Sequence, residues 1–327
     1  MKRRGTLLGL LALAATPIAA RSQPAARPAR IAFLLFGRRP PGPVPAITNR
    51  FLDAFKQGMR ELGHIEGKTF MIEPRWSLDK VEEVAKEVAA FKPDVILTNE
   101  IVARAARQAA PAVPIVLLWG DPVAGGPAKS LARPGGNITG LATLNQDTSP
   151  KLLELLLTVV PEPRHVAVLA NPIFPSYAIG LKNLQNAARQ AKVELLSIEV
   201  RSAEEIDGGF ARVAREKLRA VVVLGDPFIF ARRQQLAELA LKYRLASVYP
   251  VKEHVDVGGL MSYGVDLAGN FRRAAPYVDK ILKEERPGDL PIQQATTLEL
   301  VINLRTARSL GLTIPQSLLL RADRVIE

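Results

Sequence analysis

The chain alternates short β-branched apolar runs with amphipathic helical stretches, and this alternation constrains the fold more than any other feature of the sequence. Apolar runs that alternate with helices are typical of parallel strands covered on both faces. In the first pass of the pattern we predict strands at Arg30–Phe36, Lys68–Arg75, Asp94–Thr98 and Pro114–Trp119, and helices at Thr48–Leu62, Asp79–Phe91 and Ile101–Ala110.

The pattern begins again after a loop-like stretch that ends at Asn137–Gly140. Two similar passes predict an α/β fold made of two doubly wound lobes, each built on a parallel sheet. In the second pass we predict strands at His165–Ala170, Val193–Glu199, Ala220–Gly225 and Ala246–Tyr249, and helices at Ser176–Ala191, Ala203–Lys217 and Phe228–Tyr243.

The last part of the chain adds a helix at Leu267–Lys283, a strand at Thr297–Asn303 and a helix at Leu304–Leu310 that ends at Gly311. Such a tail can cross back between the lobes and complete a multi-strand hinge, which would allow the lobes to close on a ligand. We therefore predict lobe 1 over residues 30–143 plus 265–295, and lobe 2 over residues 144–264 plus 296–327.

Residues 1–22 have the pattern of an export signal. Lys2, Arg3 and Arg4 precede an apolar run from Thr6, which is too short to span a bilayer comfortably, and small residues follow up to Ser22. This favours a signal peptide cleaved near Ser22 over a retained anchor, while the general secretory and twin-arginine routes both stay open. The chain contains no Cys that could carry a lipid, so we predict a protein that is free in the periplasm.

Cysteine is absent and histidine is scarce, which argues against most metal and thiol chemistry. His64, His165 and His254 lie far apart in the sequence and in no ligand spacing, so we predict no metal site. The chain also lacks the motifs of serine hydrolases, phosphate-loop proteins, dinucleotide-binding enzymes and zinc proteases. We therefore predict a protein that is not an enzyme and needs no cofactor.

The formal net charge of +12 is spread along the chain rather than gathered in one basic segment. Glu82, Glu83 and Glu87 share a predicted helix with Lys80 and Lys86, which is typical of a solvated helix face. No run of Lys and Arg is interleaved with stacking aromatic residues, so we expect no nucleic-acid partner. An anionic group on a small ligand remains compatible with the basic balance.

A Gly-Asp-Pro tripeptide follows an apolar strand in each predicted lobe, at Gly120–Pro122 and at Gly225–Pro227. Open parallel sheets bind ligands at the carboxyl ends of their strands, so Asp121 and Asp226 are candidate ligand residues on opposite lobes. An Asp before Pro is also a common turn former or helix cap, and this alternative stays open. Arg133–Asn137 has the glycines of a phosphate loop but precedes a strand, which favours a connector between the lobes.

Further polar and aromatic side chains follow the predicted strands at the same edge. Hydroxyl and amide groups suit a carboxylate, acidic groups suit an ammonium, and rings clasp a side chain, so this mixture fits a small zwitterion. We predict that Thr98 and Asn99 receive a carboxylate; Trp119 and Tyr177 are walls in this interpretation, and core or rim positions for them stay open. The candidate ligand residues are Thr98, Asn99, Trp119, Gly120, Asp121, Asn171, Ser176, Tyr177, Asp226, Tyr249 and Glu253.

Several longer segments carry a resemblance to a known family, most specifically the strings Ser130–Gly140 and Gly258–Gly264. The chain resembles the tryptophan/tyrosine-type substrate-binding proteins of ABC transporters, whose fold is the two-lobed type I periplasmic binding protein. The resemblance covers essentially the whole chain after the export signal. Its other segments are Ile72–Trp76, Pro93–Ile96, Pro114–Val116, Gly120–Val123, Asn171–Pro172, Ala275–Leu282 and Glu299–Leu304.

The resemblance implies a ligand that is bound in the cleft between the lobes and released to a membrane permease with a cytoplasmic ATPase. It extends to Asp121, Asn171, Asp226 and the loop that contains Tyr249 and Glu253. The chain departs from the family pattern at Thr98–Glu100 and at Trp119, where many relatives have smaller residues. The bulk of Trp119 predicts a narrower pocket and a smaller ligand.

Together these observations predict a monomeric, periplasmic solute-binding component of an ABC importer. The expected ligand is a small amino-acid-like molecule or a polar or aromatic carboxylate. A periplasmic sensor that passes a ligand signal to a membrane receptor is the alternative, and the sequence does not separate the two.

Overall fold

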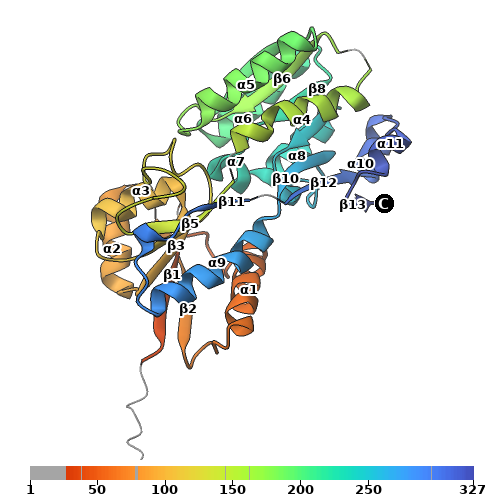
Figure 1. Cartoon of the computed structure of the whole chain (residues 1–327). Helices are drawn as coiled ribbons and strands as arrows, with labels where there is room; N and C mark the ends of the chain where they lie inside the picture. Colours follow the sequence, from red (N-terminus) through yellow and green to blue (C-terminus); the bar gives the residue numbers. More distant parts are fainter. Residues whose placement is uncertain (1–26, 38, 78–79, 144, 162, 296) are drawn as a thin grey trace, which may run out of the picture.

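A computed structural model of the chain describes residues 27–327 except positions 38, 78, 79, 144, 162 and 296. The predicted export signal at residues 1–22 therefore lies outside the described residues. The described chain forms two α/β lobes (Figure 1), with the first sheet in the lower lobe of that view and the second in the upper lobe. The predicted fold class, two lobes built on parallel sheets and joined by several chain crossings, is confirmed.

Lobe 1 is a doubly wound sheet in which every strand pairing is parallel. Alternate residues of one strand face opposite layers: Ile31 and Phe33 pack beneath helices α1 and α9, whereas Ala32 and Leu34 pack beneath α2 and α3. This explains why the inner strands β1, β3, β4 and β5 are mostly apolar, whereas the edge strands β2 and β11 contain polar residues. The helices are α1 (Ala46–Glu61), α2 (Val81–Phe91), α3 (Glu100–Ala109) and α9 (Leu267–Leu282). The strands are β1 (Ala29–Phe36), β2 (Phe70–Ser77), β3 (Val95–Asn99), β4 (Ile115–Trp119), β5 (Ile138–Ala142) and β11 (Gln293–Gln294). Their order in the sheet is β11-β5-β4-β3-β1-β2.

Lobe 2 repeats this architecture with one antiparallel pairing, between β10 and β12. Leucines of α4 and α5 pack on one face of the sheet, and α6, α7 and α8 cover the other face. The helices are α4 (Asn145–Val159), α5 (Tyr177–Gln190), α6 (Ala203–Arg215), α7 (Pro227–Ala231), α8 (Arg233–Lys242), α10 (Leu304–Leu310) and α11 (Gln316–Leu319). The strands are β6 (His165–Ala170), β7 (Glu194–Glu199), β8 (Ala220–Val223), β9 (Ala246–Tyr249), β10 (Met261–Val265), β12 (Leu298–Asn303) and β13 (Arg324–Ile326). Their order in the sheet is β13-β12-β10-β9-β8-β6-β7.

Most predicted elements lie within two residues of the observed ones, but strands β5, β10, β11 and β13 and helices α4 and α11 are absent from the prediction. Strand β5 is short and contains Gly140, where a Cβ atom would lie 2.4 Å from the backbone nitrogen and oxygen of Leu117. Helix α4 contains Pro150, which disfavours a helix interior. The predicted helix Phe228–Tyr243 is two helices, α7 and α8, which meet at Arg232.

The prediction that Arg133–Asn137 connects the lobes is wrong. The next strand, β5, pairs with β4 in the sheet of lobe 1, so the loop joins two neighbouring strands of one sheet. The chain passes from lobe to lobe elsewhere: between β5 and α4, between β10 and α9, and between β11 and β12. The exact lobe boundaries stay a prediction, and residues 144 and 296 at two of them lie outside the described residues.

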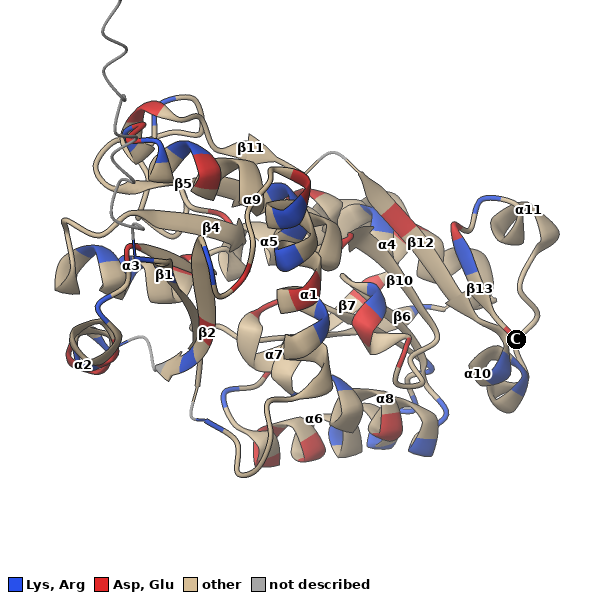
Figure 2. Ribbon diagram, turned by 90° about the horizontal axis from the view of Figure 1, so that it is seen from below, with Lys and Arg blue, Asp and Glu red and all other residues tan. Residues whose placement is uncertain are grey.

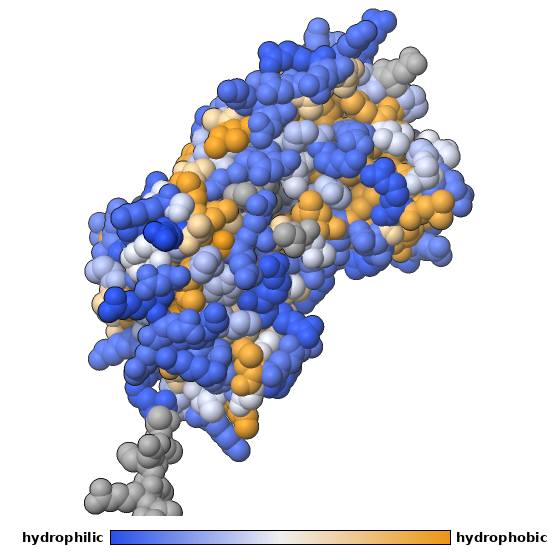
Figure 3. Space-filling model, viewed as in Figure 1, coloured by the Kyte–Doolittle hydropathy of each residue, from blue (hydrophilic) through white to orange (hydrophobic). Residues whose placement is uncertain are grey.

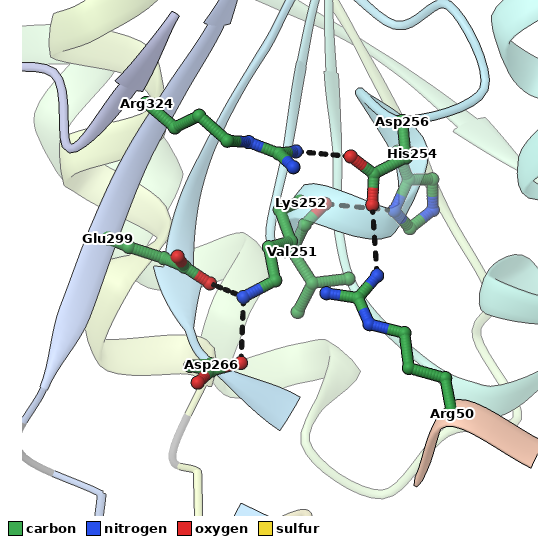
Figure 4. A network of polar contacts seen from close by, with 8 residues as sticks. All are labelled: Arg50, Val251, Lys252, His254, Asp256, Asp266, Glu299 and Arg324. Atoms are coloured by element: carbon green, nitrogen blue, oxygen red, sulfur yellow. Dashed lines mark hydrogen bonds and ion pairs between the residues drawn. The ribbon is translucent and has the colours of Figure 1, made fainter. Parts of the chain in front are cut away.

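One buried cation fastens two of these crossings (Figure 4). Lys252, in the short 3-10 helix η1 (Lys252–His254), places its Nζ 2.7 Å from Oδ1 of Asp266 and 2.6 Å from Oε1 of Glu299. Asp266 immediately precedes α9, and Glu299 lies at the start of β12. The pairing with both acids raises the pKa of Lys252 in spite of its burial. The ammonium therefore holds both crossings against η1.

A second polar contact joins the lobes directly. Asp256, just beyond η1, accepts a hydrogen bond from Arg50 of α1 at 3.3 Å and is also paired with Arg324 of β13. Figure 4 shows the Asp256 carboxylate between the two guanidinium groups. Because α1 belongs to lobe 1 and β13 to lobe 2, this carboxylate bridges the lobes at the side of the hinge.

We expect Lys252→Met to destabilise the protein, because it leaves two partly buried carboxylates facing each other without a cation. The free energy of unfolding should fall by about 2 kcal/mol, between the values typical of exposed and fully buried pairs. Urea denaturation measures this loss. Lys182→Met, on the exposed face of α5, is the matched control and should change stability little. Equal stabilities for the two variants would contradict the role of Lys252.

Candidate functional site

A cleft of about 650 Å³ lies between the lobes at the carboxyl ends of the strands. Lobe 1 contributes the last residues of β1 to β4, the loops after β1 and β4 and the first turns of α1, whereas lobe 2 contributes α7, the start of α8 and η1. A doubly wound sheet binds ligands at this edge. The volume lies within the range of small-molecule sites, and the narrower pocket expected from the bulk of Trp119 stays a prediction.

Aromatic side chains dominate the walls of the cleft. The rings of Phe51 and Phe230 face each other across the lobes with centroids 6.2 Å apart, and Phe51 also stacks on Phe271 at 4.8 Å. Trp119 packs against the same Phe271 at 5.7 Å. The aromatic residues that line the cleft are Phe36, Phe51, Trp76, Trp119, Phe174, Phe228, Phe230 and His254.

The structure brings four of the predicted ligand residues to the cleft: Asn99, Trp119, Gly120 and Asp226. Three others, Asn171, Ser176 and Tyr177, line an adjoining small pocket of about 20 Å³ that opens beside Asp226. The hydroxyl of Tyr177 donates a 3.0 Å hydrogen bond to Oε1 of Glu199. The remaining predicted residues lie in neither pocket.

Thr98 does not face the cleft. Its side chain is fully buried and its hydroxyl donates a 2.8 Å hydrogen bond to the carbonyl of Leu34 in the neighbouring strand. Asn99 does reach the cleft, but its Oδ1 accepts from the backbone N–H groups of Ile101 and Val102 and so caps α3. The amide protons that would receive a carboxylate at this helix end are therefore already occupied.

The two Gly-Asp-Pro aspartates have different roles. Oδ1 of Asp121 accepts from the backbone N–H groups of Val123 and Ala124, and Oδ2 accepts from Nε2 of Gln146 at 2.6 Å. Its carboxylate is thus used within a turn and in a contact to α4. Asp226 caps α7 through Oδ1, which accepts from the N–H of Ile229 at 2.9 Å. The turn-former interpretation therefore describes Asp121 best, whereas Asp226 combines a helix cap with a place in the cleft.

Asp226 keeps one carboxylate oxygen that makes no hydrogen bond within the described residues. Burial raises its pKa to about 6, against the lowering effect of the α7 backbone amides and of the nearby Asn171 side chain. A cationic group placed at this oxygen would offset the cost of burying the charge.

Tyr249 and Glu253 lie behind the cleft wall rather than on its surface. The ring of Tyr249 is fully buried and stacks on His254 with centroids 4.7 Å apart, and His254 is the residue that faces the cleft. Glu253 is almost completely buried, and neither of its carboxylate oxygens has a partner within the described residues. Burial raises the pKa of Glu253 to about 7 and lowers that of His254 to about 3.

Glu100 is a buried carboxyl group that the sequence prediction did not assign to the site. It is the first residue of α3 and lies directly behind Gly120, where an added Cβ atom would meet its Oε2 at 2.2 Å. Burial raises its pKa to about 8, and the charges of Asp121 and Asp226 act in the same direction. This side chain is therefore mainly uncharged at neutral pH. Glycine is favoured at position 120 because its φ of +106° is a backbone conformation that other residues rarely adopt.

The sequence prediction also missed most of the aromatic wall and the two arginines at the junction of α7 and α8. Phe228, Phe230, Arg232 and Arg233 all line the cleft, and all directly follow the second Gly-Asp-Pro. Their position after a ligand-edge motif was the available signal. Phe228 and Phe230 lie in α7, and Arg232 and Arg233 lie at the break between α7 and α8, which the sequence prediction had treated as one continuous helix.

The sequence matches the family described as "ABC transporter substrate binding protein" over residues 46–326. The chain belongs to this family. It is similar to a tyrosine-binding protein of Clostridioides difficile, with 23% identity over 270 residues. The aligned region covers 80% of this chain and 77% of that protein. These are binding proteins and not enzymes, as the sequence predicted, and the family works outside the cytoplasm with permease partners.

Solved structures agree on the fold. A conserved domain protein of Vibrio cholerae has a TM-score of 0.81 at 24% identity, covering 91% of this chain and 100% of that one. An ABC domain from Streptococcus pneumonia, solved in complex with L-Trp, has a TM-score of 0.80 at 23% identity, covering the same shares of the two chains. The predicted resemblance to tryptophan/tyrosine-type substrate-binding proteins is confirmed by the family match and the tyrosine-binding relative, and these structures confirm the fold.

Basic and acidic residues lie side by side in the view of Figure 2. Figure 2 shows Lys and Arg mixed with Asp and Glu along α6 and α8, and the face in Figure 3 is mainly hydrophilic with separate apolar patches on both lobes. Within the described part of the chain, no helix has the length and apolar character to cross a membrane. The same residues contain no group of three or more His, Asp or Glu arranged to hold a metal ion.

We expect Glu100→Gln to change the pH dependence of stability. The carboxyl ionises near its ordinary value of 4.5 in the unfolded chain but near 8 in the folded protein. Its favourable contribution is therefore complete below pH 4.5 and is lost as pH rises from 4.5 to about 8. The variant should gain stability relative to the wild type over this interval, with a slope of at most about 1.4 kcal/mol per pH unit.

Urea denaturation at several pH values from 5 to 8 measures this difference. Glu253 titrates in the same range, but it is present in both proteins and so cancels in the comparison, whereas Asp226 is coupled to Glu100 and its titration is part of the measured difference. Glu216→Gln, an exposed acid at the end of α6, is the control and should show a constant difference. A constant difference for Glu100→Gln as well would contradict its burial in the protonated form.

Proposed function

We propose that this chain is the periplasmic solute-binding component of an ABC importer and that its ligand is an aromatic amino acid or a closely related aromatic carboxylate. The observation that carries the proposal is the aromatic cleft between the two lobes at the carboxyl ends of their strands. Flat rings on both walls favour a flat, apolar ligand group, since ring–ring contacts add to the gain from removing the group from water.

The known ligands of relatives support this ligand class. One relative is a tyrosine-binding protein, and one similar structure was solved in complex with L-Trp. In this chain, we assign the ligand ring to the space bounded by Trp76, Trp119, Phe228 and Phe230. We assign an ammonium group to the unpaired oxygen of Asp226, where it would also meet the small pocket beside Asn171.

We further propose that the ligand closes the two lobes on each other. Phe51 of lobe 1 and Phe230 of lobe 2 already make contact at the cleft, and Arg50 meets Asp256 at its side. A ligand that fills the space between such pairs would be held by both lobes at once. The crossings clamped by Lys252 would then act as the hinge.

A thermal-shift screen tests the ligand class. L-tryptophan or L-tyrosine at a hundredfold excess over its dissociation constant should stabilise the protein by about 2.7 kcal/mol. Trp119→Leu should weaken binding on the order of tenfold, because it removes one ring of the wall. Tyr243→Leu, which removes an aromatic ring at the end of α8 outside the cleft, is the control and should leave binding unchanged. Absence of a shift with any aromatic amino acid or aromatic acid would overturn the proposal.

Export is tested on the expressed full-length chain. We propose that residues 1–22 direct export and that the protein is released, without a lipid, with Gln23 as its first residue. Mass spectrometry of the protein from the periplasmic fraction should therefore give the mass of the chain from Gln23. An uncleaved chain in the membrane fraction would contradict this, and a variant with Ala20→Arg should accumulate as precursor because a large residue replaces a small one near the cleavage site.

A further inference from the structure

Arg233 is a cation in the cleft that has no acidic partner among the described residues. It is the first residue of α8 and lines the cleft, with its guanidinium carbon 5.1 Å from the centre of the Phe230 ring. Among the described residues, its side chain makes a single hydrogen bond, a 3.2 Å donation from Nη1 to the carbonyl of Phe230. A guanidinium has five N–H donors in a planar fork, so most of its donor capacity is free.

The acids near Arg233 do not neutralise it by contact. Glu253 acts on Arg233 only through its charge, and both of its oxygens are buried without a hydrogen bond. Partial burial lowers the pKa of Arg233, although a guanidinium remains charged in proteins. Among the described residues, the charged groups that line the cleft are Arg232, Arg233 and Asp226, and this balance favours an anion.

The site that the sequence suggested for a carboxylate is not available. The hydroxyl of Thr98 donates a hydrogen bond to the carbonyl of Leu34. The side chain of Asn99 accepts hydrogen bonds from backbone N–H groups at the start of α3. Arg232 is more exposed than Arg233 and lies near the outer ring of Phe228. Arg233 is the half-buried member of the pair, and a half-buried guanidinium binds a carboxylate more strongly than an exposed one because water screens it less.

We infer that Arg233 binds the carboxylate of the ligand, as a fork that donates two hydrogen bonds. This inference rests on the proposed aromatic ligand and adds a requirement: the ligand must carry an anionic group on the lobe 2 side of the cleft. The ring of Phe230 supports the guanidinium from one face and holds the fork in place. The ammonium-binding role assigned to Asp226 is separate from this requirement.

Three probes that share one ring separate the two ligand groups: L-tryptophan, indole-3-propionate, which lacks the ammonium, and tryptamine, which lacks the carboxylate. Isothermal titration calorimetry with the full-length mature chain measures each affinity. Arg233→Gln should weaken L-tryptophan and indole-3-propionate at least tenfold and leave tryptamine within about twofold. Arg233→Lys should recover part of the loss, because it restores the charge but not the fork.

Arg212→Gln, on the exposed side of α6, removes the same charge far from the cleft and should leave all three affinities unchanged. Melting temperatures of the unliganded variants check that each one folds. If Arg233→Gln keeps wild-type affinity for both carboxylates, or if tryptamine binds the wild type as tightly as L-tryptophan does, the inference is wrong while the aromatic ligand stands. If the wild type binds none of the three probes, the aromatic ligand class is wrong and the inference fails with it.

Discussion

The structure depends on the rule that strands of a doubly wound parallel sheet all end at the same edge. Each strand end is followed by a loop or a helix start, and these loops are free of the packing that fixes the helices on the two faces. In this protein two such edges face each other, so residues of both lobes, such as Asn99 of lobe 1 and Phe230 of lobe 2, line one cleft. The crossings between lobes preserve this arrangement.

Burying carboxyl groups around the cleft disfavours their charged form and so costs free energy of folding. Glu100, Asp226 and Glu253 each lie in surroundings that raise the carboxyl pKa by burial. By contrast, Lys252 is buried beside two acids and gains from both. The hinge thus has its charges paired, whereas the region around the cleft has several that are not. Unpaired buried groups are typical of binding sites, where a ligand completes the pairing.

The hinge and the cleft are also linked through one short segment. Residues Val251–Asp256 contribute Lys252 to the clamp, His254 to the cleft wall and Asp256 to the contact with Arg50. A shift of η1 on ligand binding would therefore act on the crossings and on the lobe–lobe contact at once. This gives a physical route from an occupied cleft to a changed angle between the lobes.

The sequence by itself determined the two-lobed α/β fold, because apolar strands and amphipathic helices differ in periodicity and the difference survives along the whole chain. It also indicated the sheet edge at which the cleft lies, and Asn99, Trp119, Gly120 and Asp226 line that cleft, whereas their role in binding a ligand stays a prediction. The structure alone decided that Thr98 and Asp121 serve the protein's own hydrogen bonds. It also decided that Arg233 and Phe230 face the cleft, because the direction of a side chain at a strand end depends on helix breaks and contacts between distant segments, which local sequence patterns do not encode.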